Sequence, residues 1–162
     1  MTTLTVRRAI QAPAAVTFAI FNDLQVFEKR NPTVLKVEIL SEATSGVGKR
    51  WRETRLMHGR QATETMEITA FDPPRSYTVE AESCGARYVT VLSFREDDDG
   101  TEVEFRMSAQ PLTLMAKAMS AILAPIMTES VRKAIEEDLR ILGEAAEEAA
   151  AGGGEETGMD RP

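Results

Sequence analysis

The chain has 162 residues, of which 43% are hydrophobic and 28% are charged, and its formal net charge is −7. This length suits a single domain with a buried core, and the composition is that of an ordinary globular protein. No N-terminal stretch has the pattern of a secretory signal and no apolar run reaches the ~18 residues that cross a bilayer, so we expect neither secretion nor stable membrane insertion.

Negative charge is concentrated at the C-terminal end. Residues 144–162 hold six acids and one base, a net charge of −5, which leaves −2 for residues 1–143. We therefore expect one folded domain over 1–143 and a flexible acidic tail, rich in Gly and Glu, over 144–162. An almost neutral domain argues against nucleic-acid binding. The single cysteine, Cys84, cannot form an internal disulfide, which fits a cytoplasmic protein.

The first elements follow from periodicity and proline. Residues 4–10 alternate and include β-branched side chains, which predicts a short strand. Pro13 then opens a stretch with helical spacing, because proline is favoured in the first turn of a helix. A second short helix is predicted from Leu24 to Arg30. From Val34 onward apolar residues recur at every second position, which predicts another strand.

The next seventy residues are typical of an antiparallel meander whose turns set the register. We predict two-residue loops at Gly59-Arg60 (type II′), Gly85-Ala86 and Asp99-Gly100 (type I′). The three hairpins then share one apolar face, which a register error of one residue would scramble. The predicted cross-strand pairs are Trp51 with Ile68, Glu53 with Met66, Arg55 with Glu64, Met57 with Ala62, Tyr77 with Phe94, Val79 with Leu92, Ala81 with Thr90, Phe94 with Phe105 and Leu92 with Met107.

After Pro111 the apolar period returns to 3.6 and predicts a long amphipathic helix with a bend at Pro125. The first half of this helix carries one charge, Lys117, in sixteen residues. It can pack on the sheet, line a pocket, or meet a membrane or a protein partner. Together the elements predict an α+β fold: a curved antiparallel sheet of about seven strands, two short helices after the first strand, and a long C-terminal helix packed across the sheet.

Four segments resemble a known superfamily: "RRAIQAPAAVTFAIFND" near the start, "GVGKRWRETR", "ITAFDPPRSY" and the closing helix. Over about residues 2 to 143 they resemble the START/Bet v 1-like (SRPBCC) "helix-grip" superfamily, and more closely its bacterial polyketide cyclase/dehydrase and lipid-transport branch. The resemblance implies a cavity between the curved sheet and the C-terminal helix. It does not select a function, since the superfamily includes lipid carriers, hormone receptors, aromatic cyclases, ubiquinone-binding proteins and chaperone activators.

Several catalytic and cofactor classes are disfavoured by the residues present. The single histidine, His58, lies beside a predicted hairpin turn, where a Ser-His-Asp or Cys-His triad would have to form at a loop tip. One histidine and one cysteine give no familiar zinc set, and "SGVGKRW" lacks the glycine spacing of a phosphate or dinucleotide loop. We therefore expect no metal and no cofactor. The local basic cluster is interpreted as a solvated hairpin and comprises Lys49, Arg50, Arg52, Arg55 and Arg60.

Three charged side chains fall on the predicted apolar face. Arg55 and Glu64 face each other in the predicted register and can form an ion pair, whereas Glu53 lies two residues deeper, beside Trp51. A carboxylate in that position needs a partner or becomes protonated. Glu53, Arg55 and Glu64 can orient the polar end of a ligand, Glu53 can act as an acid or base, or the cluster can be structural.

The candidate ligand-binding residues lie on the predicted sheet face and the first half of the long helix. Six methionines fall there, and methionine suits an adaptable apolar surface: Met57, Met66, Met107, Met115, Met119 and Met127. The full predicted set comprises Trp51, Glu53, Arg55, Met57, Glu64, Met66, Ile68, Tyr77, Val79, Ala81, Tyr88, Thr90, Leu92, Phe105, Met107, Met115, Met119 and Ile122.

Three functions remain open at this point. The first is a binder or carrier of a small hydrophobic or amphipathic molecule that is lipid-, quinone- or polyketide-like, acting as a monomer or homodimer. The second is an enzyme of the cyclase or dehydratase kind with Glu53 as general acid or base and Arg55 and Glu64 as weaker catalytic candidates. The third is an interaction module that uses the apolar half of the helix, around Met119 and Ile122.

Overall fold

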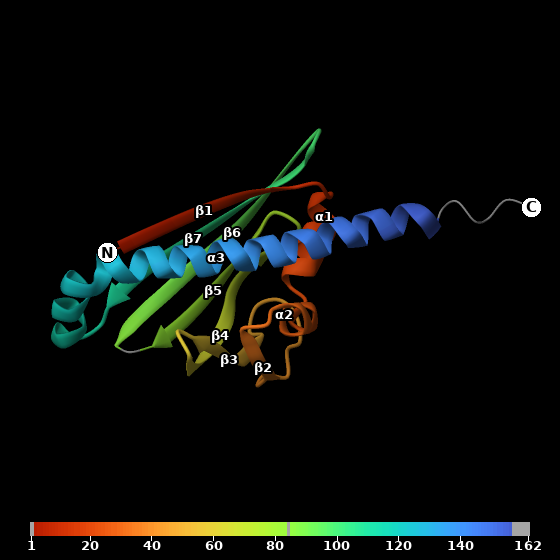
Figure 1. Cartoon of the computed structure of the whole chain (residues 1–162). Helices are drawn as coiled ribbons and strands as arrows, with labels where there is room; N and C mark the ends of the chain where they lie inside the picture. Colours follow the sequence, from red (N-terminus) through yellow and green to blue (C-terminus); the bar gives the residue numbers. More distant parts are fainter. Residues whose placement is uncertain (1, 84, 157–162) are drawn as a thin grey trace, which may run out of the picture.

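A computed structural model describes the backbone of residues 2–83 and 85–156 and the side chains of residues 3–83, 85–119 and 128–152. It confirms the α+β helix-grip architecture, with an antiparallel sheet in the order β1-β7-β6-β5-β4-β3-β2. Figure 1 shows the long helix α3 crossing one face of the sheet, with α1 and α2 near one end of the sheet. The elements are β1 (Thr2–Ile10), α1 (Ala14–Phe21), α2 (Leu24–Arg30), β2 (Val34–Ile39), β3 (Arg50–Met57), β4 (Arg60–Asp72), β5 (Ser76–Ser83), β6 (Ala86–Asp97), β7 (Gly100–Pro111) and α3 (Leu114–Glu156).

Helix α2 is fixed at both its start and its side. The Asp23 carboxylate caps it by accepting hydrogen bonds from the backbone N–H groups of Gln25 and Val26 at 3.0 and 3.3 Å. The Glu28 carboxylate accepts a hydrogen bond of 2.6 Å from the backbone N–H of Val37 on β2. Because β2 is an edge strand, this contact covers part of an otherwise unpaired edge.

The predicted register of the first hairpin is wrong by two residues. Trp51 pairs with Met66, Glu53 with Glu64 and Arg55 with Ala62, instead of the pairs predicted from a Gly59-Arg60 loop. The reason is the turn: His58 and Gly59 form it, with positive φ values of 51° and 76°. Positive φ at both central residues is the type I′ pattern, not the type II′ pattern expected from the sequence.

The other two hairpins are displaced in the same way. Tyr77 pairs with Leu92 and Ser83 with Ala86, while Leu92 pairs with Phe105, so that Asp98 and Asp99 occupy the last two-residue loop. The Cys84 position itself lies outside the described residues. Side chains alternate faces with a period of two, so a displacement of two preserves the predicted inner face of the sheet, the face covered by α3.

The core includes a cluster of aromatic rings at the α1 end of the sheet. Five aromatic rings, two from α1 and one each from β4, β5 and β6, contact one another there with centroid separations of 5.2 to 6.0 Å. Ile135, Leu139 and Leu142 of α3 close this cluster from the helix side. The rings belong to Phe18, Phe21, Phe71, Tyr77 and Phe94.

Helix α3 extends into the acidic segment that follows residue 143. It continues past Gly143 to Glu156, and Ala145 and Ala146 are 3% and 0% exposed. Figure 1 shows its first turns at a steep angle to the remainder. The predicted bend at Pro125 falls among residues 120–127, whose side chains lie outside the described set. Flexibility of the acidic segment stays a prediction.

The ring cluster predicts where stability is concentrated. We expect Phe94→Ala to lower the free energy of unfolding by about 3 to 5 kcal/mol, because Phe94 is 5% exposed and contacts three other rings. Urea unfolding followed by circular dichroism measures this loss. Leu35→Ala, at a residue 46% exposed, is the control and should cost less than about 1 kcal/mol. Equal losses in the two variants would contradict this placement of the core.

Candidate functional site

Three polar side chains of β3 form a row on the inner face of the sheet. Trp51, Glu53 and Arg55 alternate with outward-facing neighbours, as a period of two requires. Trp51 and Glu53 are 6% and 4% exposed, and the side chain of Arg55 is 19% exposed. The sequence analysis placed Glu53 correctly as the deepest charge of the hairpin.

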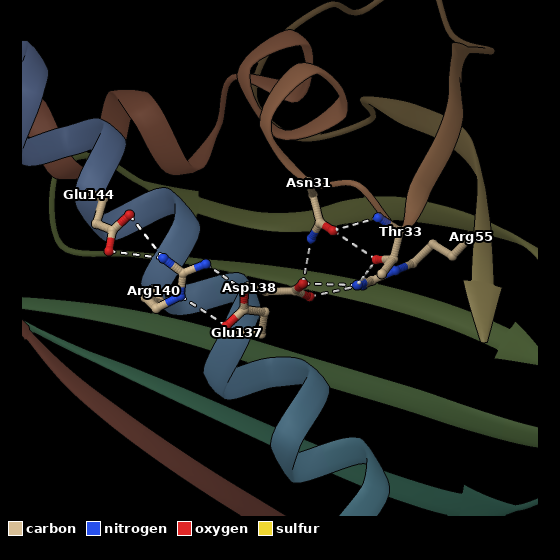
Figure 2. A network of polar contacts seen from close by, with 7 residues as sticks. All are labelled: Asn31, Thr33, Arg55, Glu137, Asp138, Arg140 and Glu144. Carbon is tan, nitrogen blue, oxygen red and sulfur yellow. Dashed lines mark hydrogen bonds and ion pairs between the residues drawn. The ribbon is translucent and has the colours of Figure 1, made fainter. Parts of the chain in front are cut away.

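Arg55 is held by Asp138 of α3 and not by Glu64. Its two terminal nitrogens donate to the two Asp138 carboxylate oxygens at 2.8 and 2.9 Å, an arrangement that Figure 2 shows from close by. The predicted Arg55–Glu64 ion pair is therefore wrong, because the shifted register places Glu64 opposite Glu53. Bidentate pairing of this kind fixes both the position and the orientation of a guanidinium.

Two residues in the segment before β2 form hydrogen bonds with the ion pair: Asn31 with Asp138, and Thr33 with Arg55. The Asn31 amide donates to Asp138 at 2.7 Å, and its oxygen accepts from the Thr33 backbone N–H and hydroxyl at 3.0 and 2.7 Å. The Thr33 hydroxyl oxygen in turn accepts from Arg55 at 3.1 Å. The guanidinium also lies 5.6 Å from the centre of the Phe27 ring. Arg55 is thus fixed by a contact from α2 and by hydrogen bonds from Thr33 and from Asp138 of α3, the last two shown in Figure 2.

The remaining contact of Arg55 is a weaker one with Glu53. Its Nε lies 3.6 Å from the Glu53 carboxylate, which is too long for a hydrogen bond. Arg55 Nε and Trp51 Nε1 are both buried donors without a hydrogen-bond partner in the part of the chain that the structure describes. Glu64, half-buried and directly opposite Glu53, likewise forms no hydrogen bond or ion pair with the described side chains.

Burial raises the pKa of the Glu53 carboxyl to about 7, from an ordinary value of 4.5. The nearby Arg55 charge opposes this rise in the pKa, whereas the negative charges of Asp138 and Glu64 add to it. The Trp51 N–H lowers the Glu53 pKa by a smaller amount, although no hydrogen bond of regular geometry joins the two groups. Desolvation is the largest of these effects, so the neutral carboxyl of Glu53 persists to a higher pH than that of an ordinary glutamate.

A small cavity of about 170 Å³ opens beside the Arg55–Asp138 pair. His58 and Ser130 lie on its wall, and the His58 Nε2 and Ser130 Oγ atoms are 2.7 Å apart. The volume is below the ~300 Å³ at which ligand pockets begin. A larger cavity between the sheet and α3 stays a prediction.

Beyond this cavity the inner face continues as a half-buried strip across four strands. Met66, Val79 and Ala81 lie on β4 and β5, and the strip continues on β6 and β7. These side chains are neither sealed in the core nor fully exposed, as expected for a surface that can take up an apolar molecule. We call this set the half-buried strip; it comprises Glu64, Met66, Val79, Ala81, Tyr88, Thr90, Phe105 and Met107.

The other predicted site residues fall into four groups. Trp51, Ile68, Tyr77 and Leu92 are buried in the core, and Met57 is half-buried on the wall of the small cavity. Two residues of α3 are instead exposed: Met115 is 77% and Met119 is 53% exposed. The side chains of Ile122 and Met127 lie outside the described residues.

Asp138, Asn31 and Thr33 were not predicted as part of the site. Asp138 directly precedes Leu139 and follows Ile135 by three residues, so it borders the apolar stripe of α3. An acid beside such a stripe is a weak signal, since most of them face solvent. No feature of the local pattern indicates which strand it meets.

Comparison with known proteins gives one family and a set of similar folds. The family model described as "Polyketide cyclase / dehydrase and lipid transport" matches residues 1–147. Comparison with curated proteins found no match. Among the described residues, no helix is long and apolar enough to cross a membrane.

Solved structures with the same fold are similar to the chain over most of its length. The protein TTHA0849 from Thermus thermophilus has a TM-score of 0.76 and 17% identity, and the match covers 92% of this chain and 99% of that one. The ZhuI aromatase/cyclase from Streptomyces sp. R1128 has a TM-score of 0.69 and 18% identity, covering 94% and 98%. The di-domain aromatase/cyclase StfQ from the steffimycin pathway has a TM-score of 0.73 and 10% identity, covering 92% and 52%. Identities this low show a common fold.

The raised pKa of Glu53 predicts a pH-dependent stability. Between the unfolded value of 4.5 and the folded value of about 7, the folded protein binds more protons than the unfolded chain. The contribution of Glu53 to stability is therefore full below about pH 4.5 and is lost as the pH rises through about 7. Relative to Glu53→Gln, the free energy of unfolding of the wild type should fall by about 2 to 3 kcal/mol between pH 4.5 and pH 8.

Urea titrations at a series of pH values measure this difference. Glu67→Gln removes an exposed carboxylate from the neighbouring strand and controls for a simple loss of charge. Parallel pH profiles for the wild type and Glu53→Gln would show that Glu53 does not titrate as described.

Proposed function

Because the chain belongs to the polyketide cyclase/dehydrase and lipid-transport family, we propose that it binds a small hydrophobic or amphipathic molecule against the half-buried strip. The ligand is lipid-, quinone- or polyketide-like and lies between the sheet and α3. The observation that carries the proposal is the contrast along the inner face, where a tightly packed ring cluster gives way to incompletely buried apolar side chains beside Glu53.

Burial of apolar area supplies the affinity. An apolar ligand that covers Met66, Val79 and Ala81 removes both its own surface and theirs from water, at roughly 25 cal/mol per Å². Methionine side chains adapt to ligands of irregular shape. Glu53 and Trp51 then give the ligand an orientation, because their polar atoms lie at the buried end of the same face.

A cyclase or dehydratase activity is the second candidate, and one observation favours it. A carboxyl group whose pKa lies near 7 can both donate and accept a proton at neutral pH, as general acid-base catalysis requires. The ZhuI and StfQ structures are those of aromatase/cyclases. In this reading Glu53 removes the acidic proton next to a ketone of the bound ligand, and Arg55 and Asp138 hold the surrounding elements in place.

Ligand uptake can be tested with a fluorescent apolar probe, N-phenyl-1-naphthylamine. We expect Ala81→Phe to raise the dissociation constant at least tenfold, because the added ring fills the half-buried strip at its centre. Ala70→Phe is the matched control: Ala70 is exposed and pairs with Thr78 on the opposite face, so it should leave the dissociation constant unchanged. No binding by the wild type, or equal effects in the two variants, would refute the proposed ligand site.

The two functions differ in what Glu53 does to a bound ligand. Ethyl benzoylacetate in D₂O reports proton abstraction through the loss of its α-proton NMR signal. For a binder, the wild type gives no acceleration of this exchange, and Glu53→Gln changes affinity alone. For a cyclase-type enzyme, the wild type accelerates exchange and Glu53→Gln reduces the rate at least 100-fold while the dissociation constant changes less than threefold.

A further inference from the structure

Arg55 is the cation of the inner-face row on β3, and its charge is already neutralised. An arginine on a ligand-binding face is ordinarily expected to receive the carboxylate or phosphate of a ligand, through the same two-pronged geometry. Here both terminal nitrogens donate to Asp138, and one of them also donates to Thr33. Three of the five guanidinium N–H groups are therefore in use, and the pair of terminal nitrogens that would bind an anion with two prongs already holds Asp138.

The charges that face Glu53 add up to an environment unfavourable to anions. Arg55 from β3 and Asp138 from α3 form an ion pair, while Glu64 from β4 lies directly opposite Glu53 and adds a negative charge that forms no ion pair among the described residues. The β2 neighbour on the other side is the uncharged Val37. A carboxylate headgroup placed here would meet a net negative charge at low dielectric, where repulsion is strong.

The unpaired donors of this row are buried, so a ligand group that reaches them must leave water, which costs less for an uncharged group than for an ion. Trp51 is 6% exposed, and its indole N–H has no hydrogen-bond partner among the described residues. The Arg55 Nε–H beside Glu53 is in the same situation. A hydroxyl or carbonyl oxygen can accept a hydrogen bond from such donors, and a hydroxyl can also donate to Glu53.

We propose that Asp138 is a positioning residue that sets ligand selectivity: by holding the guanidinium of Arg55, it makes the inner face accept an uncharged hydroxyl or carbonyl group and reject an anionic headgroup. The proposal rests on the function proposed above and specifies the class of its ligand. Asp138 itself does not touch the ligand. It acts through Arg55, which it keeps from pairing with an incoming anion.

A pair of probes that differ mainly in charge tests this selectivity. Methyl 2-naphthoate is an uncharged ester, and 2-naphthoate is its anionic acid at pH 7.5. By isothermal titration calorimetry we expect the wild type to bind the ester at least tenfold more tightly than the anion. In Asp138→Asn the freed guanidinium should bind the anion, so that this ratio falls at least tenfold.

Glu137→Gln is the matched control on the same turn of α3. Glu137 pairs with Arg140 and not with Arg55, so its loss removes one carboxylate without releasing the guanidinium (Figure 2). The ratio should stay at its wild-type value in Glu137→Gln and in Asp138→Glu, which retains a partner for Arg55.

Each alternative outcome is decisive. Equal affinity of the wild type for the two probes would overturn the selectivity proposal and leave the ligand site standing, and this comparison needs no variant to fold. An unchanged ratio in a folded Asp138→Asn would overturn the role of Asp138. Binding of neither probe by the wild type would refute the ligand site and the selectivity together.

Discussion

The ion pair between Arg55 and Asp138 joins strand β3, next to the edge strand β2, to the long helix. The two residues are 83 positions apart in the chain, and two hydrogen bonds of 2.8 and 2.9 Å connect them. Removing two charges from water costs about as much as their attraction returns, so such a pair adds little net stability. Its effect is geometric: it fixes where α3 lies relative to β3. On the same stretch of the helix, Ile135, Leu139 and Leu142 pack against the core cluster that includes Phe18 and Phe94.

Periodicity predicted the fold and the inner face, but not the register. His58-Gly59 and Gly59-Arg60 are both acceptable two-residue loops, and moving the loop by one position changes each cross-strand pair by two. A change of two in the pairing register leaves every side chain on the same face, so the alternation of apolar and polar residues cannot reveal it. For this reason Glu53 was correctly placed on the inner face and yet assigned the wrong neighbour, Met66 in place of Glu64.

The partner of Arg55 could not be predicted for a different reason. The apolar stripe of α3, with Ile135, Leu139 and Leu142, shows which side of the helix meets the sheet. Which strand Asp138 reaches depends on the angle at which the helix crosses the sheet. That angle is the outcome of packing along the whole of α3 and is not encoded in any short stretch of sequence. Sequence patterns therefore identified the helix face and missed the contact at its border.

The chemistry of the inner face follows from how Arg55 divides its contacts. Two effects act on Glu53: burial, which favours the neutral carboxyl, and the guanidinium, which favours the carboxylate. A guanidinium that donated two hydrogen bonds to Glu53 would favour the carboxylate more strongly than burial favours the neutral carboxyl. Charge-assisted bidentate bonds are about twice as strong as neutral ones. Asp138 takes those two bonds, and Glu53 retains an approach of 3.6 Å to Nε. The effect of burial is therefore the larger of the two, and it raises the pKa of Glu53 to about 7. The contact that holds the helix in place is thus also the one that leaves Glu53 able to be neutral, so the position of α3 and the charge of the ligand-facing surface are determined together.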